Sequence, residues 1–180
     1  MRRFFFLAVI AATLPAVAQT PAGVARFLPV NDHLYRGAQP SELGIDSLAK
    51  IGVRSVIDLR GTGERSVVEK KRVEAAGMRY FSIPMPALGA PSDAAIAVVL
   101  GLLDDSKNWP VFIHCQRGKD RTGTVIACYR ITHDGWENER ALKEARAHGL
   151  SMAERGMRDF ILKYKRVPHE PEVATRAAAP

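Results

Sequence analysis

Several features that mark common protein classes are missing from this sequence of 180 residues. No stretch reaches the length and apolarity of a mature membrane span, which argues against a permanent transmembrane segment. No basic block is interleaved with aromatic residues, so nucleic acid is not an expected partner. The sequence has no internal repeats. Outside the central motif the histidines have no metal-ligand spacing, so we predict no metal and no cofactor; they are His33, His133, His148 and His169.

Cysteine is also scarce, with two residues in the chain. Cys115 follows a short apolar run, and Cys128 lies further along between Ala127 and Tyr129. We interpret Cys128 as a core residue and Cys115 as a free thiolate. A regulatory disulfide between the two is the open alternative, because it depends on a geometry that the sequence does not contain.

Residues 1–18 carry the three parts of a secretory signal in their usual order. Arg2 and Arg3 form a positively charged start, residues 4–14 are apolar, and residues 16–18 are an Ala-Val-Ala cleavage site. The alternative is a buried N-terminal helix. We expect export to the periplasm or the cell exterior, with a mature chain that begins near Gln19. The formal charge of +7 favours anionic partners such as phosphates.

Residues 19–167 are expected to form one α/β domain. Short apolar runs bounded by turn residues predict strands, and longer amphipathic stretches predict helices. The predicted strands are 27–30, 34–37, 53–59, 79–83 and 111–113, and the predicted helices are 41–50, 64–76, 92–103, 136–148 and 152–165. Their alternation predicts a central, mostly parallel sheet flanked by helices. Residues 168–180 are rich in proline and alanine and are expected to be a disordered tail.

The most informative stretch runs from Trp109 to Gly123 and reads W-P-V-F-I-H-C-Q-R-G-K-D-R-T-G. It predicts a buried strand, a tight loop that turns at Gly118, and a helix that begins near Thr122. Ligands of parallel sheets bind at the carboxyl ends of strands, which is where this loop lies.

The spacing of Cys115 and Arg121 suits phosphate chemistry. Wrapped as one turn, the backbone N–H groups between them can point at a single centre, and the following helix adds a partial positive charge. Arg121 can fork onto two phosphate oxygens. The same field stabilises a Cys115 thiolate, which is a nucleophile. The predicted substrate-binding residues are Gln116, Arg117, Gly118, Lys119, Asp120 and Arg121.

This loop resembles the signature H-C-x5-R-T of the cysteine-dependent protein tyrosine and dual-specificity phosphatases. His114, Cys115, Gly118, Arg121 and Thr122 match it position by position. The resemblance implies a dual-specificity-phosphatase-like fold. His114 is expected to hydrogen-bond within the loop and to orient it, and Thr122 to donate its hydroxyl group to the Cys115 sulfur.

The resemblance covers roughly residues 33–165. Two further segments, L-Y-R-G-A-Q-P at 34–40 and V-I-D-L-R at 56–60, precede the loop in two related groups of proteins. One group contains bacterial tyrosine and lipid phosphatases. The other contains plant and fungal atypical dual-specificity phosphatases that act on inositol pyrophosphates. The motif is specific for the superfamily and not for the substrate.

Two loop positions carry information on the substrate. Arg117 and Lys119 add cations beyond Arg121, and a substrate with several phosphates would gain from them by Coulomb attraction. The alternative is that both side chains project into solvent and contribute only to solubility. The expected partner is therefore a phosphorylated substrate that either does or does not carry further phosphates.

The general acid is where this sequence departs from the superfamily. An aspartate usually occupies the loop that here spans residues 84–91, which contains no acid. Asp93 is the first carboxylate after this loop and is also a candidate helix N-cap. Asp120 is the second candidate, because myotubularin-like phosphatases with a C-x-x-G-x-D-R loop are proposed to use this aspartate. Asp58 is the third, at a strand end where it can instead hold Arg60.

The sequence as a whole predicts an exported, metal-independent phosphatase with a phosphocysteine intermediate. Cys115 attacks phosphorus in line, Arg121 and loop amides stabilise the equatorial oxygens, and an aspartate, Asp93 before Asp120, protonates the leaving group. The substrate is a phosphotyrosine or phosphoprotein, or a phosphoinositide or inositol polyphosphate. The rivals are a catalytically idle phosphate-binding module and a rhodanese-like sulfurtransferase, which C-x5-R-T fits less well.

Overall fold

The computed structural model of the chain describes residues 20–166. The signal sequence expected over residues 1–18 and the tail expected over 168–180 lie outside these residues. None of the helices within 20–166 is long and apolar enough to cross a membrane.

A single five-stranded sheet forms the centre of the described domain, in the order β1-β2-β5-β3-β4. Strand β1 is antiparallel to β2, and β2, β5, β3 and β4 are parallel to one another. The predicted α/β domain with a mostly parallel sheet is therefore confirmed. The strands are β1 (Leu28–Pro29), β2 (Leu34–Ala38), β3 (Ser55–Asp58), β4 (Arg79–Ser82) and β5 (Val111–Cys115).

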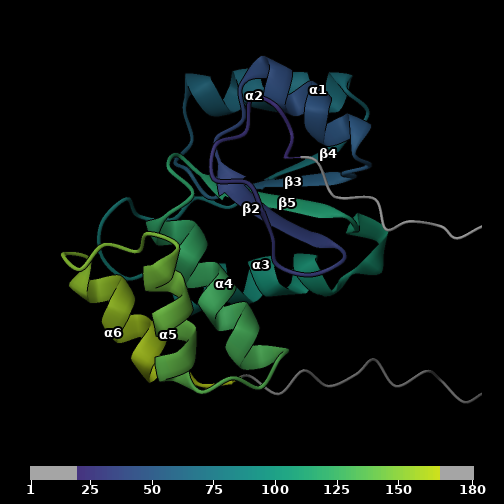
Figure 1. The fold of residues 1–180 in the computed structure, drawn as a ribbon. Helices are drawn as coiled ribbons and strands as arrows, with labels where there is room; N and C mark the ends of the chain where they lie inside the picture. Colours follow the sequence, from purple (N-terminus) through teal and green to yellow (C-terminus); the bar gives the residue numbers. More distant parts are fainter. Residues whose placement is uncertain (1–19, 167–180) are drawn as a thin grey trace, which may run out of the picture.

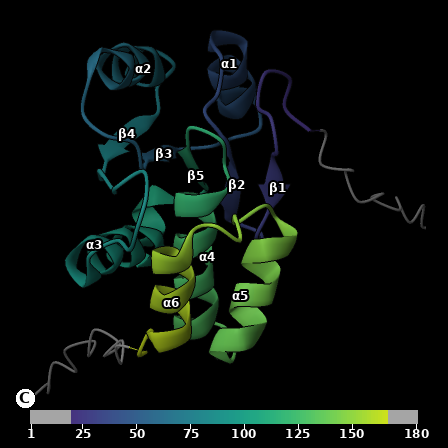
Figure 2. The same ribbon diagram turned by 90° about the vertical axis from the view of Figure 1, so that its left-hand side faces the viewer.

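Helices cover both faces of this sheet. Helices α1 and α2 lie over one face, and α3 to α6 lie on the other side (Figures 1 and 2). Helix α4 follows β5 directly, and α5 and α6 pack against α4. The helices are α1 (Glu42–Lys50), α2 (Glu64–Ala75), α3 (Asp93–Asp104), the short 3-10 helix η1 (Ser106–Asn108), α4 (Asp120–Thr132), α5 (Asn138–Ala147) and α6 (Arg155–Lys163).

Strand β5 is buried along its whole length, as is β3, because layers of helices cover both faces of the sheet. All five of its residues are buried. Phe112 packs into the apolar cluster beneath α1 and α2, whereas Ile113 packs into the larger cluster beneath α3 and α4. Successive strand side chains point to opposite faces, so each contributes to a different cluster. Burying each such side chain stabilises the fold by about 1.5–3 kcal/mol.

Capping residues explain where two helices begin. The Oγ atom of Ser41, the first residue of the predicted helix 41–50, accepts a hydrogen bond from the backbone N–H of Gly44 at 3.2 Å. At α3 the cap is Ser92, whose Oγ accepts from the N–H of Ala95 at 3.2 Å. Asp93 is therefore the first residue of α3 itself, where a carboxylate complements the positive end of the helix dipole.

The last two helices begin later than the predicted bounds of 136–148 and 152–165. Before α6 the chain makes a turn in which the carbonyl of Ser151 accepts from the N–H of Glu154 at 3.2 Å. The N–H of Ser151 donates to Oδ1 of Asp120 at 2.8 Å. This bond to the start of α4 holds the segment in a non-helical path, which local propensity alone does not predict.

The parallel strands place three loop starts at one edge of the sheet. Ala38 pairs in register with Cys115, and Asp58 pairs with His114. The segments that follow β2, β3 and β5 therefore meet beside the predicted phosphate loop.

Candidate active site

Cys115 lies at the floor of a small cavity at this edge of the sheet. Cys115 is the last residue of β5 and is 3% exposed. The cavity has a volume of about 180 Å³. It is lined by Ala87, Leu88, Cys115, Gln116, Arg117, Asp120, Arg121 and Glu154. The predicted loop therefore encloses a space of its own beside the cysteine.

The surroundings of Cys115 favour its thiolate form. Burial alone raises the pKa of a thiol, but here the pKa is lowered below its ordinary value by hydrogen bonds and charge. The groups that lower it are the Thr122 side chain and the backbone N–H groups of Thr122 and Arg117, and Arg121 adds its positive charge. Thr122 itself is completely buried. The pKa shift therefore comes from the loop and from the first turn of α4.

Helix α4 begins at Asp120 and not at Thr122 as predicted. Asp120 and Arg121 thus belong to its first turn, in which the backbone N–H of Thr122 helps to lower the pKa of Cys115. The Arg121 guanidinium lines the cavity and donates through NH1 to the carbonyl of Leu59 at 3.2 Å. Its other N–H groups make no further hydrogen bond within residues 20–166 and are available to a ligand. Arg121 and Cys115 therefore line the same cavity.

Gly118 lets the loop pack on the end of β2. Its φ is +66°, and a Cβ atom there would lie 2.5 Å from the backbone of Gly37. The positive φ and the close approach together require glycine at this position. Its carbonyl accepts a hydrogen bond from NH2 of Arg36 at 3.1 Å.

Arg36 is a supporting residue that the sequence analysis did not select. It is 2% exposed, and burial lowers the pKa of its guanidinium, against the opposing effects of Glu144 and Cys115. It therefore places a buried positive charge beneath the loop. Its position in the L-Y-R-G-A-Q-P segment was the available signal, because that segment ends in register with Cys115.

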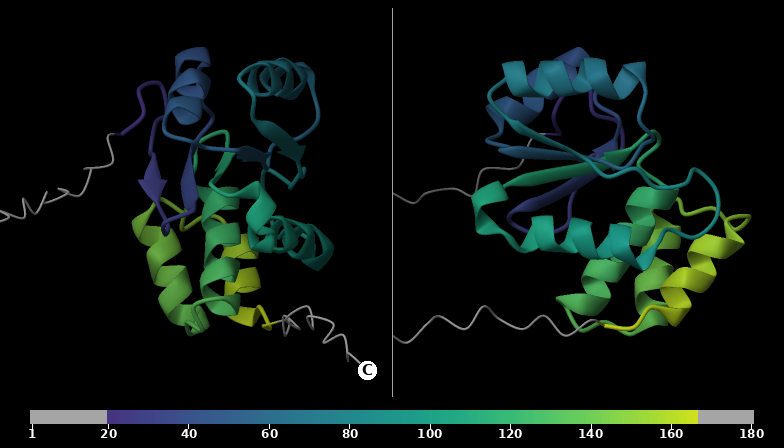
Figure 3. Two further views of the ribbon diagram at one scale, coloured as in Figure 1. Left: turned by 90° about the vertical axis from the view of Figure 1, so that its right-hand side faces the viewer. Right: turned by 180° about the vertical axis from the view of Figure 1, so that it is seen from behind.

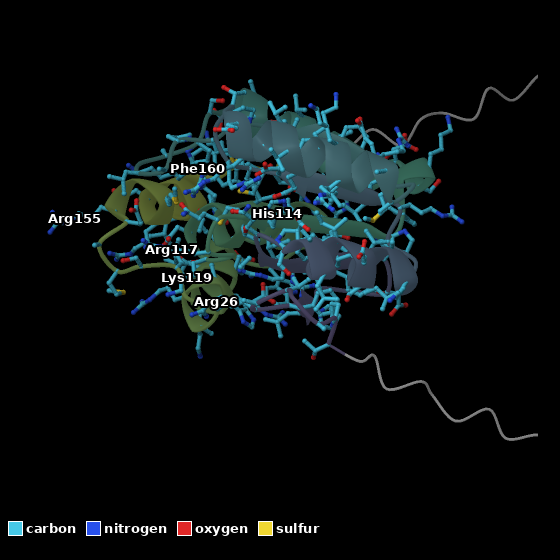
Figure 4. The ribbon with its side chains drawn as sticks, turned by 90° about the horizontal axis from the view of Figure 1, so that it is seen from above. Arg26, His114, Arg117, Lys119, Arg155 and Phe160 are labelled. Carbon is cyan, nitrogen blue, oxygen red and sulfur yellow. The ribbon has the colours of Figure 1, made fainter. Side chains whose placement is uncertain are left out.

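The two extra loop cations differ in their placement. Arg117 is exposed and lines the cavity. The aliphatic part of Lys119 packs against Gly149, where a Cβ atom would come within 3.1 Å of Cγ of the lysine. Figure 4 labels both residues at the end of the molecule where α6 begins, with His114 toward its centre.

A buried ionic network supports the loop from the side of β3 and α2. Arg60 donates to both carboxylate oxygens of Asp58, at 2.8 and 2.7 Å, and to Oε2 of Glu69 at 2.8 Å. The other oxygen of Glu69 lies 2.7 Å from Nε2 of His114. His114 is completely buried, and its Nδ1 lies 3.3 Å from the carbonyl oxygen of Cys115. Glu69 therefore holds the imidazole ring next to Cys115.

Asp58 is an ionised anchor in this network. Burial raises the pKa of its carboxyl group, but hydrogen bonds from Arg60 and Tyr80 and the nearby His114 outweigh it and lower the pKa to about 2. The Tyr80 hydroxyl donates to Oδ2 at 2.6 Å. A group that stays ionised and fully bonded has no proton to give, so the interpretation that Asp58 holds Arg60 is the one that the geometry supports.

Three of these side chains could in principle bind a metal ion. Ligand atoms of Asp58, Glu69 and His114 lie within 4.8 Å of one another. The guanidinium of Arg60 already occupies the place between the two carboxylates, and Glu69 is bonded to His114. These contacts already engage all three side chains, and the absence of a metal cofactor stays a prediction.

The structure does not bring Asp93 to the cavity around Cys115. Asp93 instead lines a different cavity, between α3 and α6, together with Asp159, Phe160 and Tyr164. Phe160 is labelled in Figure 4. The preference for Asp93 over Asp120 is thus not supported, because Ser92 takes the capping position and turns Asp93 into the helix. The carboxylates that do line the Cys115 cavity are Asp120 and Glu154.

Glu154 is the second residue that the sequence analysis missed. It lies just before α6, far along the chain from the phosphate loop, and no motif marks it. Its Oε2 atom accepts a hydrogen bond from the N–H of Gly89 at 3.2 Å. Glu154 reaches the cavity because the start of α6 packs beside the loop that follows β4.

Cys128 is a buried free thiol, as is Cys115. Burial raises the pKa of Cys128, so it stays a thiol, which agrees with its interpretation as a core residue. A helix rises about 1.5 Å per residue, which puts Cys128 about 12 Å along α4 from Asp120. Since a disulfide needs Cα atoms within about 7 Å, a bridge to Cys115 would require the helix to move.

Comparisons with known proteins agree with this geometry. The family model described as "DSP-PTPase phosphatase fused to NAD+ Kinase" matches residues 16–161. The dual specificity protein phosphatase TpbA of Pseudomonas aeruginosa is 30% identical over 145 residues, which are 81% of this chain and 64% of TpbA. Inositol diphosphatase DSP5 of Arabidopsis thaliana is 29% identical over 151 residues, which are 77% of this chain and 72% of DSP5. The chain thus spans just under two thirds of the length of TpbA.

Solved structures share the fold. The core catalytic domain of the PP-IP phosphatase SIW14 from S. cerevisiae superposes with a TM-score of 0.67 at 22% identity, covering 78% of this chain and 85% of that one. A P. aeruginosa TpbA variant in complex with pTyr also superposes with a TM-score of 0.67, at 24% identity, covering 82% and 93% of the two chains. Because the family model matches most of this chain, the chain belongs to the dual-specificity-type protein tyrosine phosphatase family.

Proposed function

We propose that this protein hydrolyses phosphate monoesters through a covalent phosphocysteine on Cys115. The observation that carries the proposal is the buried Cys115 thiol, whose pKa is lowered and which faces a cavity shared with Arg121. A phosphate in this cavity would accept hydrogen bonds from the loop amides and from Arg121. Its equatorial oxygens gain negative charge in the transition state, where such preorganised donors act most strongly.

The reaction has two steps. The Cys115 thiolate attacks phosphorus, the bond from phosphorus to the leaving oxygen breaks, and the leaving oxygen takes a proton from a general acid. Water then attacks the phosphocysteine, releases inorganic phosphate and restores the thiolate. The Thr122 hydroxyl stabilises the sulfur anion when it leaves in this second step.

The test is the turnover of Cys115→Ser beside Cys128→Ala. Serine lacks the low pKa that this site gives a thiol, so Cys115→Ser is expected to lose turnover of nitrophenyl phosphate while it still binds phosphate. Cys128→Ala removes the other thiol and is expected to keep activity. Turnover in Cys115→Ser would refute the mechanism. An inactive wild-type protein that binds phosphate would favour the idle binding module.

We further infer that the substrate carries more than one phosphate. A second cavity of about 430 Å³ adjoins the first and shares Ala87, Gln116 and Arg121 with it. It adds Arg65, and it is also lined by Glu64 and by Arg60, whose guanidinium is already paired with Asp58 and Glu69. Among the relatives, DSP5 is named an inositol diphosphatase, and SIW14 is named a PP-IP phosphatase. A second phosphate near the first would meet the positive charge of Arg65 as well as that of Arg121.

The two extra loop cations, Arg117 and Lys119, provide the test for this inference. Replacing Arg117 and Lys119 by alanine should lower kcat/KM for inositol hexakisphosphate or a diphosphoinositol by roughly 5- to 30-fold more than for nitrophenyl phosphate, as expected for about 1–2 kcal/mol of charge interaction. Replacing Lys50 and Lys71, which are exposed on α1 and α2, is the charge-matched control. Equal losses on both substrates would show that Arg117 and Lys119 only support the loop, and would favour a monophosphate substrate such as phosphotyrosine.

Export is proposed separately, on the composition of residues 1–18. Cell fractionation of a tagged chain should recover a protein shortened at its N-terminus in the periplasm or medium, with sequencing that begins near Gln19. A full-length protein in the cytoplasmic fraction would contradict this proposal without affecting the proposed chemistry.

A further inference from the structure

Glu154 faces the cavity around Cys115 from outside the phosphate loop. Most of the cavity lining belongs to the loop and to α4, whereas Ala87, Leu88 and Glu154 form the remaining wall. Leu88 is 75% exposed, so this wall lies at the mouth of the cavity. Glu154 itself is half-buried.

Two contacts fix the position of this carboxylate. Oε2 of Glu154 accepts a hydrogen bond from the N–H of Gly89 at 3.2 Å. In the first turn of α6, Gly156 lies so close to the same loop that a Cβ atom would be 2.9 Å from the N atom of Ala90. Figure 3 shows the loop after β4 reaching toward the start of α6. The acid-free loop of residues 84–91 is therefore held against an element that does bring an acid.

The direction of the reaction selects this wall. In phosphoryl transfer the attacking and leaving atoms lie roughly in line, on opposite sides of phosphorus. Cys115 attacks from the floor, and the loop amides and Arg121 surround the equatorial oxygens. The leaving oxygen therefore points to the mouth, where Leu88 and Glu154 lie. A general acid has to stand within hydrogen-bond reach of that oxygen.

Asp120 lies in the same cavity but is placed for another role. It is the first residue of α4. Its Oδ1 atom accepts from the N–H of Ser151 at 2.8 Å. Asp120 therefore ties the segment before α6 to the phosphate loop, which in turn positions Glu154.

We propose that Glu154 is the general acid of this enzyme, on the basis of the proposed phosphocysteine mechanism. In the first step its carboxylic acid gives a proton to the leaving oxygen as the bond to phosphorus breaks, and Glu154 becomes a carboxylate. In the second step this carboxylate takes a proton from the water that attacks the phosphocysteine. The proton balance closes, and the Cys115 thiolate is restored.

The variant Glu154→Gln separates catalysis from structure. Glutamine keeps an oxygen that can accept from the N–H of Gly89, but it has no proton to transfer. Hydrolysis of an alkyl phosphate such as glycerol phosphate should fall by about 10²- to 10⁴-fold, because its leaving group needs protonation. Hydrolysis of nitrophenyl phosphate, whose leaving group is stable as an anion, should fall by less than about tenfold. Glu139→Gln, an exposed residue on α5, is the matched control.

The pH profile gives a second readout. An acid that must be protonated produces a loss of kcat/KM toward high pH, and Glu154→Gln should remove that limb for the alkyl substrate. The titratable and charged groups that face Glu154 across the cavity are Cys115, Arg117, Asp120 and Arg121. Deprotonation of Cys115 produces the opposite, low-pH limb, so the two contributions can be separated.

Three outcomes would overturn the assignment. Wild-type kinetics in Glu154→Gln would show that the side chain only accepts the hydrogen bond from Gly89. Equal losses on both substrates would show a role in binding or folding. A loss that depends on the leaving group in Asp120→Asn, and not in Glu154→Gln, would move the acid into the loop. In all three cases the inactivity of Cys115→Ser on nitrophenyl phosphate still tests the proposed function independently.

Discussion

The hydroxyl group of Thr122 offers the sharpest test of how this loop activates Cys115. Thr122 is completely buried, and its Oγ1 atom makes no hydrogen bond of ordinary geometry within residues 20–166, so its hydroxyl stays available to the Cys115 thiolate, whose pKa the side chain lowers. Thr122→Val keeps the shape of the side chain and removes the donor. Thr122→Ser keeps the donor and is the control.

The expected magnitude follows from the strength of a hydrogen bond to a charged group. Such a bond contributes about 1.5–3 kcal/mol, and one pKa unit corresponds to about 1.4 kcal/mol, so Thr122→Val should raise the pKa of Cys115 by about 1–2 units. The sign follows from the loss of a donor to the anion. Protonation of the thiolate then begins at a higher pH, so at neutral pH a smaller fraction of Cys115 is reactive.

The rate of alkylation by iodoacetamide as a function of pH measures this shift directly. The thiolate is the reacting species, so the midpoint of the rate profile reports the pKa of Cys115. Mass spectrometry of the labelled peptides separates Cys115 from Cys128, whose raised pKa keeps it unreactive. The low-pH limb of phosphatase activity should move upward by the same amount.

An unchanged alkylation profile in Thr122→Val would refute this reasoning. It would mean that the backbone N–H groups and the charge of Arg121 hold the thiolate without the hydroxyl. A shift that appears equally in Thr122→Ser would also contradict it, because serine retains the donor.

Other predictions concern the supports of the site. Gly118→Ala should abolish activity and lower the free energy of unfolding by roughly 1–3 kcal/mol, because this position has a positive φ and its new Cβ would meet the backbone of β2. Gly52 also has a positive φ but faces open space, so Gly52→Ala should leave kcat/KM unchanged. Activity assays and urea unfolding check both variants. The pKa of Asp58 is depressed in the folded state, so the stability that its ionised form contributes above its ordinary pKa of 3.8 is lost as the pH falls toward about 2. Tyr80→Phe removes one donor to this carboxylate and should reduce that loss, as measured by urea midpoints across this pH range. An identical pH dependence in the variant would contradict the role of the tyrosine. Gly156→Ala should push the loop after β4 outward and slow alkyl phosphate hydrolysis more than nitrophenyl phosphate hydrolysis, and a uniform effect on the two substrates would show that this contact does not position the acid.

The phosphate loop could be predicted from the sequence because its geometry is local. A buried strand, a glycine at the turn and a helix start follow one another within residues 111–123, and the backbone amides between Cys115 and Arg121 need no distant partner to converge. The alternation of strands and helices likewise predicted the parallel sheet. The structure shifted the start of α4 by two residues, from Thr122 to Asp120, and left the loop as expected.

The supports of the loop depended on contacts between distant segments. Arg36 comes from β2, and Glu69 reaches His114 from α2. Neither residue belongs to the signature, and a lone buried arginine or glutamate in a sequence has no pattern that reveals its partner. Strand order decided these contacts, because β5 lies between β2 and β3 in the sheet.

The candidate acid shows the same division most clearly. Chain order favoured Asp93, since it follows the loop where an acid is usual, but the cap at Ser92 places Asp93 in α3, facing a cavity beside α6. The cavity beside Cys115 is instead lined by Asp120 and by Glu154, which arrives from the far end of the domain. Residues close in sequence share a loop because the backbone connects them, so their arrangement can be derived locally. Residues that converge only through helix packing are placed by the burial of apolar surface between helices, which the order of the chain does not specify.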